Sequence, residues 1–138
     1  MSVIGGLGTA VSGLKAAQTQ LNVSADNVAN ARSVGAEKLE GPARSEDGRN
    51  LFRPSRTTLA AQENGGVRAG TAPVQPTSVQ RFSPDAADAN AEGLVNRPNV
   101  SFVQETATQI RAQTQFAANL ATVRAADEMA GETLDITE

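Results

Sequence analysis

Apolar residues recur in the first part of the chain at the spacing of an amphipathic helix. From residue 4 to residue 28 they lie alternately three and four positions apart, which is typical of a helix with one heptad-patterned seam. We call these residues the apolar seam: Ile4, Leu7, Val11, Leu14, Leu21, Ala25 and Val28, with Gln18 at the one polar position. We expect a helix that ends near Gly35, because glycine needs no Cβ in the left-handed turn that stops a helix.

Small residues lie between the seam positions and predict close helix contacts. A helix can approach another more closely where its side chains are short. The residues concerned are Ala10, Ser12, Ala16, Ala17 and Ser24.

A second helical stripe follows Pro98 near the other end of the chain. Asn99 or Ser101 could cap the helix, and Glu105 favours the positive end of its dipole. Gly131 is expected to fray its end. The stripe consists of Ile110, Phe116, Leu120, Val123, Ala130 and Leu134, broadened by Val103, Ala107 and Ala117.

The middle of the chain contains all six prolines and reads as short strands and turns. Residues 56–62, then Asn64-Gly65, then Val67 onward predict a hairpin, because Asn-Gly suits a tight turn between strands. Pro73 and Pro76 would confine the second strand to an edge. We expect residues 83–97 to form an extended connection to the second helix.

These patterns predict a mainly α fold in which long N- and C-terminal helices pack as a coiled coil around a small β-rich or irregular middle domain. We place the boundaries at residues 1–36, 37–98 and 99–138. An ordinary two-helix core within one chain remains open beside intermolecular contact, because two amphipathic helices expose more apolar surface than a thin middle region covers.

Large core-forming residues are scarce in this chain of 138 residues. Leu, Ile, Val and Phe together number 28, whereas there are 24 Ala. About a fifth is the level at which a chain struggles to build a core of its own. The composition therefore favours a structural part whose core is completed by its neighbours.

Charge and hydropathy exclude several classes of partner. A net charge of −3 without a concentrated basic face argues against nucleic acid. No run approaches the ~18 apolar residues that span a bilayer. The N-terminus lacks the basic region and continuous apolar run of a secretory signal. The chain is expected either to stay in the cytoplasm or to leave by a route without a cleaved signal.

The residues give no support for catalysis, and we expect no enzyme, no cofactor and no metal. The chain has no His and no Cys, which removes the commonest metal ligands and nucleophile–base pairs. Asp127 and Glu128 are adjacent on a helix and point about 100° apart. Asp85 and Asp88 lack the spacing of a calcium loop.

Two segments carry motifs of a known family. Ser12-Gly13-Leu14, Leu21-Asn22 and Asn27-Val28-Ala29-Asn30 resemble the N-terminal signature of the flagellar rod and hook proteins, which runs Ser-Gly-Leu, Leu-Asn, Asn-Ile-Ala-Asn. The Thr-x-Gly-Tyr corner of that family is Ser33-Val34-Gly35-Ala36 here. Pro98-Asn99-Val100 and the helix after it resemble the proximal rod proteins, and the chain length is similar to theirs.

The resemblance implies a structural subunit of the proximal rod in the bacterial flagellar basal body. Such proteins polymerise by coiled-coil packing of their terminal helices and transmit torque from the motor ring to the distal rod and hook. The implied partners are other rod subunits, the rod-to-ring adaptor, the membrane ring protein and further copies in a helical assembly, with no nucleic acid and no direct membrane insertion. The implied location is the periplasm-spanning rod, reached through the flagellar type III system without a cleaved signal.

We expect subunit packing to involve apolar seam residues, residues of the second stripe, and asparagines that hydrogen-bond across helices and fix register. Plain surface and capping roles remain open for these asparagines. The alternatives to a proximal rod subunit are another flagellar rod paralogue or a type III-secreted helical adaptor. The packing residues are Leu7, Val11, Leu14, Leu21, Asn22, Asn27, Val28, Asn30, Ile110, Phe116, Asn119, Leu120 and Val123.

Overall fold

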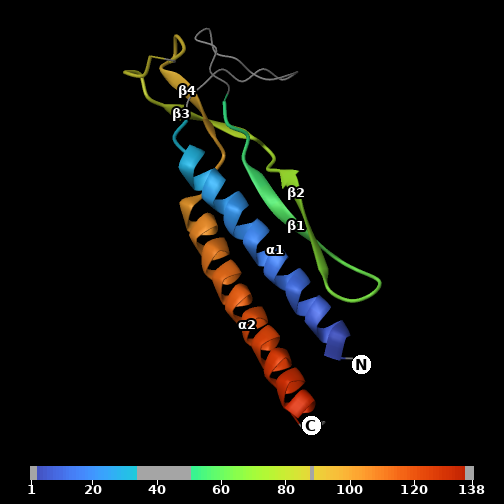
Figure 1. Cartoon of the computed structure of the whole chain (residues 1–138). Helices are drawn as coiled ribbons and strands as arrows, with labels where there is room; N and C mark the ends of the chain where they lie inside the picture. Colours follow the sequence, from blue (N-terminus) through green and yellow to red (C-terminus); the bar gives the residue numbers. More distant parts are fainter. Residues whose placement is uncertain (1–2, 34–50, 88, 136–138) are drawn as a thin grey trace.

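Two long helices and four short strands make up the chain. The computed structural model describes residues 3–33, 51–87 and 89–135. Helix α1 spans Val3–Asn30, and helix α2 spans Phe102–Asp135. The four strands lie between them in sequence and form two antiparallel pairs, so the expected mainly α fold with a small β-containing middle is confirmed. Figure 1 shows both termini at the same end of the molecule.

The two helices run antiparallel, and two contacts fix their register. At one level, a Cβ added to Gly13 would lie 2.6 Å from Oδ1 of Asn119, so the helices approach closely there. At another level, Asn27 hydrogen-bonds to Glu105. Fourteen residues separate the two contacts on each helix, which is about 21 Å at 1.5 Å per residue. Equal spacing on both helices means that they stay in step along this length.

The face that α1 buries consists of small residues. Ala10, Ala17, Ser24 and Ala31 are all buried and recur every seven positions. Ala112 of α2, which is 1% exposed, lies between the two register contacts on the partner helix. Short side chains allow the close approach that the sequence predicted, although they bury little apolar area per residue.

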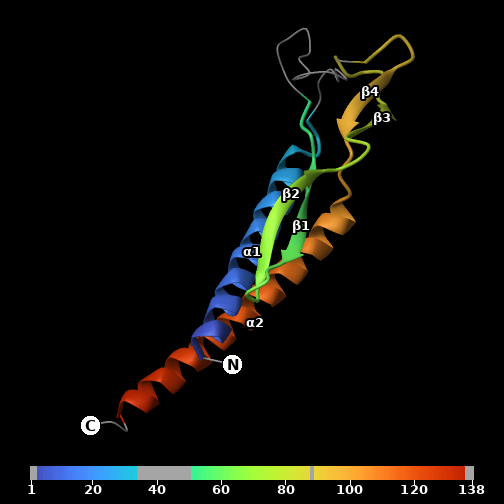
Figure 2. The same ribbon diagram turned by 90° about the vertical axis from the view of Figure 1, so that its right-hand side faces the viewer.

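The first strand pair is the expected hairpin and lies along α1 (Figure 2). Strand β1 spans Ser55–Ala61 and pairs with β2, which spans Val67–Pro73. Gly65 and Gly66 have φ angles of 85° and 89°, a backbone conformation that glycine adopts without a Cβ penalty. Asn64-Gly65-Gly66 therefore closes the hairpin. Strand β2 ends at Pro73 and, in a two-stranded sheet, is an edge strand as predicted.

The second strand pair was not expected. Strand β3 spans Ser78–Phe82 and pairs with β4, which spans Leu94–Pro98. The prediction of an extended connection over residues 83–97 was wrong for β4. Val95 is 2% exposed, so β4 contributes to the core. The loop before it is closed by Asn90, whose Oδ1 accepts hydrogen bonds from the backbone N–H groups of Glu92 (3.1 Å) and Leu94 (2.8 Å).

Helix α2 begins where the capping signals place it. The Ser101 carbonyl accepts the first helical bond, from Glu105 N–H at 2.9 Å, and Ser101 Oγ lies 3.5 Å from Gln104 N. Ser101 is thus the N-cap, whereas Asn99 donates its amide to the Pro76 carbonyl at 2.9 Å. The predicted stop of the first helix at Gly35 lies outside the described residues.

Candidate functional site

Asn27 lies at the junction of three elements and is 2% exposed. Its Nδ2 donates to the Ser55 carbonyl at 2.7 Å and to Oε1 of Glu105 at 2.8 Å. Its Oδ1 accepts from Ser55 N–H at 3.1 Å. One side-chain amide on α1 thus joins the start of β1 to the first turn of α2, and we call this group the Asn27 junction.

The amide of Asn27 acts toward Ser55 as a neighbouring strand would. It satisfies both the N–H and the C=O of one residue, which is the pattern of an antiparallel hydrogen-bonded pair. Ser24, one turn earlier and 1% exposed, donates its hydroxyl to the Glu105 carbonyl at 3.1 Å. Buried polar groups without partners are costly, so this arrangement specifies how the three elements meet.

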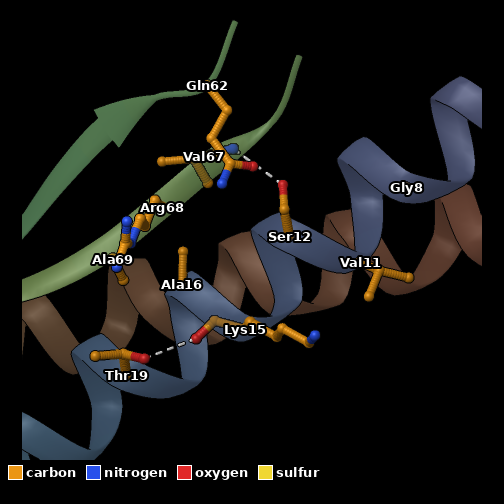
Figure 3. A pocket seen from close by; sticks show the side chains of 10 residues that line it. All are labelled: Gly8, Val11, Ser12, Lys15, Ala16, Thr19, Gln62, Val67, Arg68 and Ala69. Atoms are coloured by element: carbon orange, nitrogen blue, oxygen red, sulfur yellow. Dashed lines mark hydrogen bonds between the residues drawn. The ribbon is translucent and has the colours of Figure 1, made fainter. Parts of the chain in front are cut away.

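A second junction lies at the other end of the hairpin. Ser12 Oγ accepts from Val67 N–H at 3.0 Å (Figure 3). It donates to the Thr9 carbonyl at 2.7 Å. A Cβ added to Gly66 would lie 2.5 Å from Ser12 Oγ. Gly13, which follows Ser12 in α1, faces Asn119 of α2. Adjacent residues of α1 therefore hold the hairpin on one side and the partner helix on the other.

The matches to known proteins fall on the segments that contain these contacts. Residues 7–36 match the family model described as flagella basal body rod protein. Residues 91–136 match the model described as flagellar basal body rod FlgEFG protein C-terminal. Together the two models cover most of α1 and all of α2.

Relatives extend the match over the whole chain. The flagellar basal-body rod protein FlgC of Agrobacterium fabrum is 29% identical over 128 residues, which cover 91% of this chain and 88% of the relative. The flagellar basal-body rod protein FlgC of Yersinia enterocolitica is 32% identical over 137 residues, 99% of this chain and 98% of the relative. The chain belongs to the flagellar basal-body rod proteins. The predicted family is therefore confirmed, with FlgC proteins among its relatives.

Membership of the rod protein family bears on two broader predictions. The family consists of structural proteins of the flagellum, in keeping with a chain that is not an enzyme. Its members are located in the basal body, as predicted. In the part of the chain that the structure describes, no group of His, Cys, Asp and Glu residues could hold a metal ion. Over the same residues, no helix has the length and apolar character needed to cross a membrane.

The rod-family signature at Ser12-Gly13-Leu14 now has a structural explanation. Ser12 accepts a hydrogen bond from the hairpin, and Gly13 leaves room for the side chain of Asn119. Asn27, from the family's Asn-Ile-Ala-Asn motif, forms the Asn27 junction. Three motif residues, Ser12, Gly13 and Asn27, thus contact other elements of the same chain.

The predicted packing residues lie mainly outside the buried face of α1. Within the apolar seam, Leu7 is 38% exposed and Val11 37%, while Leu14, Leu21 and Val28 are half-buried. On α2, Ile110 is 59% exposed and Phe116 40%, and Leu120 and Val123 are half-buried. Large apolar side chains therefore remain accessible along both helices.

The four predicted asparagines differ in their contacts. Asn27 bonds across helices within the chain. Asn30 Nδ2 donates to the Asp26 carbonyl at 2.9 Å and Asn119 Nδ2 to the Gln115 carbonyl at 2.8 Å, each on its own helix. Asn22 is exposed.

Sequence reasoning did not single out Ser55, and it assigned Glu105 to the helix dipole alone. No local pattern reveals that a strand start and a carboxylate 50 residues later meet at one amide.

An apolar face covers the first turns of α2. Phe102 is 48% exposed and Val103 81%, and with Ala107 and Ile110 they line a shallow depression on the helix surface. Monomeric proteins rarely leave such a face uncovered unless it contacts a partner.

Proposed function

We propose that this chain is a subunit of the proximal rod of the flagellar basal body, where it polymerises by coiled-coil packing and transmits torque from the motor ring to the distal rod and hook. The observation that supports this proposal is that small and large residues of α1 have different roles. Small residues form the contacts within the chain, while the larger residues of the apolar seam stay accessible. Because α1 contacts its own chain through small residues, its large apolar residues are available to contact another subunit.

The proposed contacts between subunits join the apolar seam of one copy to the α2 stripe of another. Leu7 and Val11 lie in the N-terminal part of α1, and Ile110 lies in the N-terminal part of α2. Because the helices run antiparallel, these residues lie toward opposite ends of the helix pair. Different surfaces on the two partners give a heterologous contact, which generates open helical assemblies when it does not close. Leu14, Leu21, Val28, Phe116, Leu120 and Val123 extend the same two stripes.

Torque transmission requires a subunit that does not shear internally. The Asn27 junction and the Ser12–Gly13 contacts tie the hairpin to both helices at two levels. A load applied to α2 therefore reaches α1 and β1 through directional bonds as well as packing.

The remaining features of the proposal follow from the family. Residues 1–36 and 99–138 form the helical layer of the rod, and residues 37–98 form its outer part. The partners are other rod subunits, the rod-to-ring adaptor and the membrane ring protein. The chain reaches them through the flagellar type III system without a cleaved signal.

The test uses aspartate substitutions at exposed positions, so that the fold of the single chain is little disturbed. Leu7→Asp and Ile110→Asp place a charge on each proposed packing stripe, and Ala91→Asp places the same charge on the exposed loop before β4. Each variant is expressed in cells that lack the native gene, and its amount in purified basal bodies is measured by mass spectrometry. We expect Ala91→Asp at the wild-type level and the two helix variants at less than a tenth of it. Normal incorporation and motility of both helix variants would contradict the proposal.

A further inference from the structure

The edge of β1 that faces α2 has unused hydrogen-bonding groups. Gln62 N–H donates to the Gly66 carbonyl at 3.1 Å, and Val74 N–H donates to the Pro54 carbonyl at 2.9 Å. Because bonded pairs alternate along an antiparallel ladder, the even-numbered residues of β1 bond to β2. The odd-numbered residues, among them Ser55, present their backbone groups to the opposite edge.

Only the first position of this edge is occupied among the described residues. The amide of Asn27 takes both backbone groups of Ser55. Thr57 and Leu59, the next two outward-facing residues, have no hydrogen-bond partner for these groups in the described part of the chain. An unpaired strand edge is a template for another strand unless the protein covers it.

A groove runs along this edge. Residues of β1, α2 and α1 line it, with α1 contributing Gln20, Val23 and Ser24. It encloses about 510 Å³, and a second hollow of about 390 Å³ continues it toward the hairpin turn, sharing Leu59 and Gln115. We call it the β1 groove.

The charge of the β1 groove favours an acidic occupant. Arg56 and Arg111 both line it. The Arg111 side chain donates to the Ala107 carbonyl and to the Thr108 hydroxyl, both at 3.3 Å. The guanidinium of Arg56 has no hydrogen-bond partner among the described residues. The carboxylate that lines the groove, Glu105, is already bonded to Asn27. A guanidinium that is not bonded to a carboxylate can bind one from a partner.

The opposite edge of the hairpin is less suitable. Along β2, Val67 N–H is held by Ser12, and the strand ends in Pro73, which has no N–H to offer. The hollow on that side holds about 320 Å³ and is walled by α1 without α2.

We propose that the β1 groove binds an extended segment of a neighbouring polypeptide, which adds a third strand to the hairpin at Thr57 and Leu59 and places a carboxylate beside Arg111. Main-chain bonds to the edge supply affinity, and alternate side chains of the segment contact Leu59 and Val23. The proposal rests on the proposed function only for the source of the segment, which is an adjoining rod subunit.

The test titrates the full-length chain with the peptide acetyl-Thr-Val-Glu-Val-Thr-amide and follows backbone amides by NMR. We expect saturable shifts at Thr57 and Leu59. Thr57→Pro removes an outward-facing N–H without removing a bond to β2, and should weaken binding at least tenfold. Thr71→Pro is the matched control, because Thr71 is the cross-strand partner of Thr57 and its N–H faces the far edge. It should change the dissociation constant less than twofold.

The role of Arg111 is tested with the peptide in which Gln replaces Glu. It should bind the wild-type chain at least threefold more weakly, and Arg111→Gln should abolish this preference. If Thr57→Pro loses its helical circular dichroism, a peptide N-methylated at its central residues replaces it and should not bind the wild-type chain.

Three results would overturn the inference: no saturable shift at Thr57 and Leu59, equal binding by wild type and Thr57→Pro, or loss of binding on Thr71→Pro alone. Absence of the chain from purified basal bodies would instead contradict the proposed function and leave the titration unaffected.

Discussion

The Asn27→Ala substitution removes the side-chain amide that joins α1, β1 and α2. Three groups lose their partner: the N–H and the C=O of Ser55, and the carboxylate of Glu105. A neutral hydrogen bond contributes about 0.5–1.5 kcal/mol, and one to a charged group about 1.5–3 kcal/mol. Ser55 and Glu105 are half-buried, so water replaces part of what is lost. We expect the free energy of unfolding to fall by about 2–3 kcal/mol after this discount.

The assay is urea unfolding of the full chain, followed by far-UV circular dichroism. With a slope of about 1–2 kcal/mol per molar urea, the midpoint should fall by about 1–3 M. Asn30→Ala is the matched control, because among the described residues the Asn30 side chain bonds to the Asp26 carbonyl of its own helix. It should change the unfolding free energy by less than about 0.5 kcal/mol. Equal effects of the two substitutions would refute the assignment of the junction to Asn27.

A charge introduced at position 27 tests the geometry of the Asn27 junction more finely. Asn27→Asp keeps an acceptor for Ser55 N–H but directs a second oxygen at the Ser55 carbonyl and the Glu105 carboxylate. It should destabilise the chain at least as much as Asn27→Ala. Glu105→Gln supplies a donor to that oxygen. The double variant should therefore be more stable, by at least about 1 kcal/mol, than the sum of the two single effects predicts. Strictly additive effects would contradict the contact.

Three glycines give further predictions, each checked by urea unfolding. Gly13→Ala should destabilise the chain by about 1 kcal/mol, although alanine favours helices, because its Cβ would overlap the side chain of Asn119. In an Asn119→Ala background the same change should stabilise the chain. A gain in stability from Gly13→Ala alone would refute the close approach of the two helices. Gly66→Ala should cost about 2 kcal/mol, because its φ is +89° and the new Cβ would meet Ser12 Oγ. Gly131→Ala, with nothing within 4 Å of the new Cβ, should instead stabilise α2 by about 0.5–1 kcal/mol, and destabilisation there would show a contact that the described residues do not account for.

Local signals in the sequence were sufficient for several elements. Asn64-Gly65 marked the first hairpin, and Pro98 with Ser101 marked the start of α2, because these residue types favour a turn, a helix boundary or a cap. The hairpin of β3 and β4 gave no such signal. Its strands are five residues long, and the turn from Asn90 to Gly93 before β4 is reinforced by the side chain of Asn90.

The sequence predicted close helix contacts at the small residues of α1, but it did not show that these residues form the buried face in place of the apolar seam, for a physical reason. Hydrophobic periodicity finds large apolar residues, and these lie on the apolar seam. The buried stripe consists of Ala10, Ala17, Ser24 and Ala31, whose spacing of seven is regular but whose apolar signal is weak. Nor does the sequence distinguish Asn27 from Asn22, since only the tertiary fold brings Ser55 and Glu105 to one of them.

The central claim is that neighbouring subunits in the basal body cover the apolar seam and the apolar face of α2. The chain has no Cys, so a single introduced cysteine reports on one position. Leu7→Cys and Ile110→Cys probe the two stripes, at positions 38% and 59% exposed in the single chain, and Glu92→Cys probes the exposed loop before β4.

The deciding measurement is the rate of maleimide labelling of each cysteine in the free chain and in purified basal bodies. All three should react readily in the free chain. In basal bodies, labelling at positions 7 and 110 should slow at least tenfold while position 92 keeps its rate. Labelling of positions 7 and 110 at the free-chain rate in basal bodies would contradict the account.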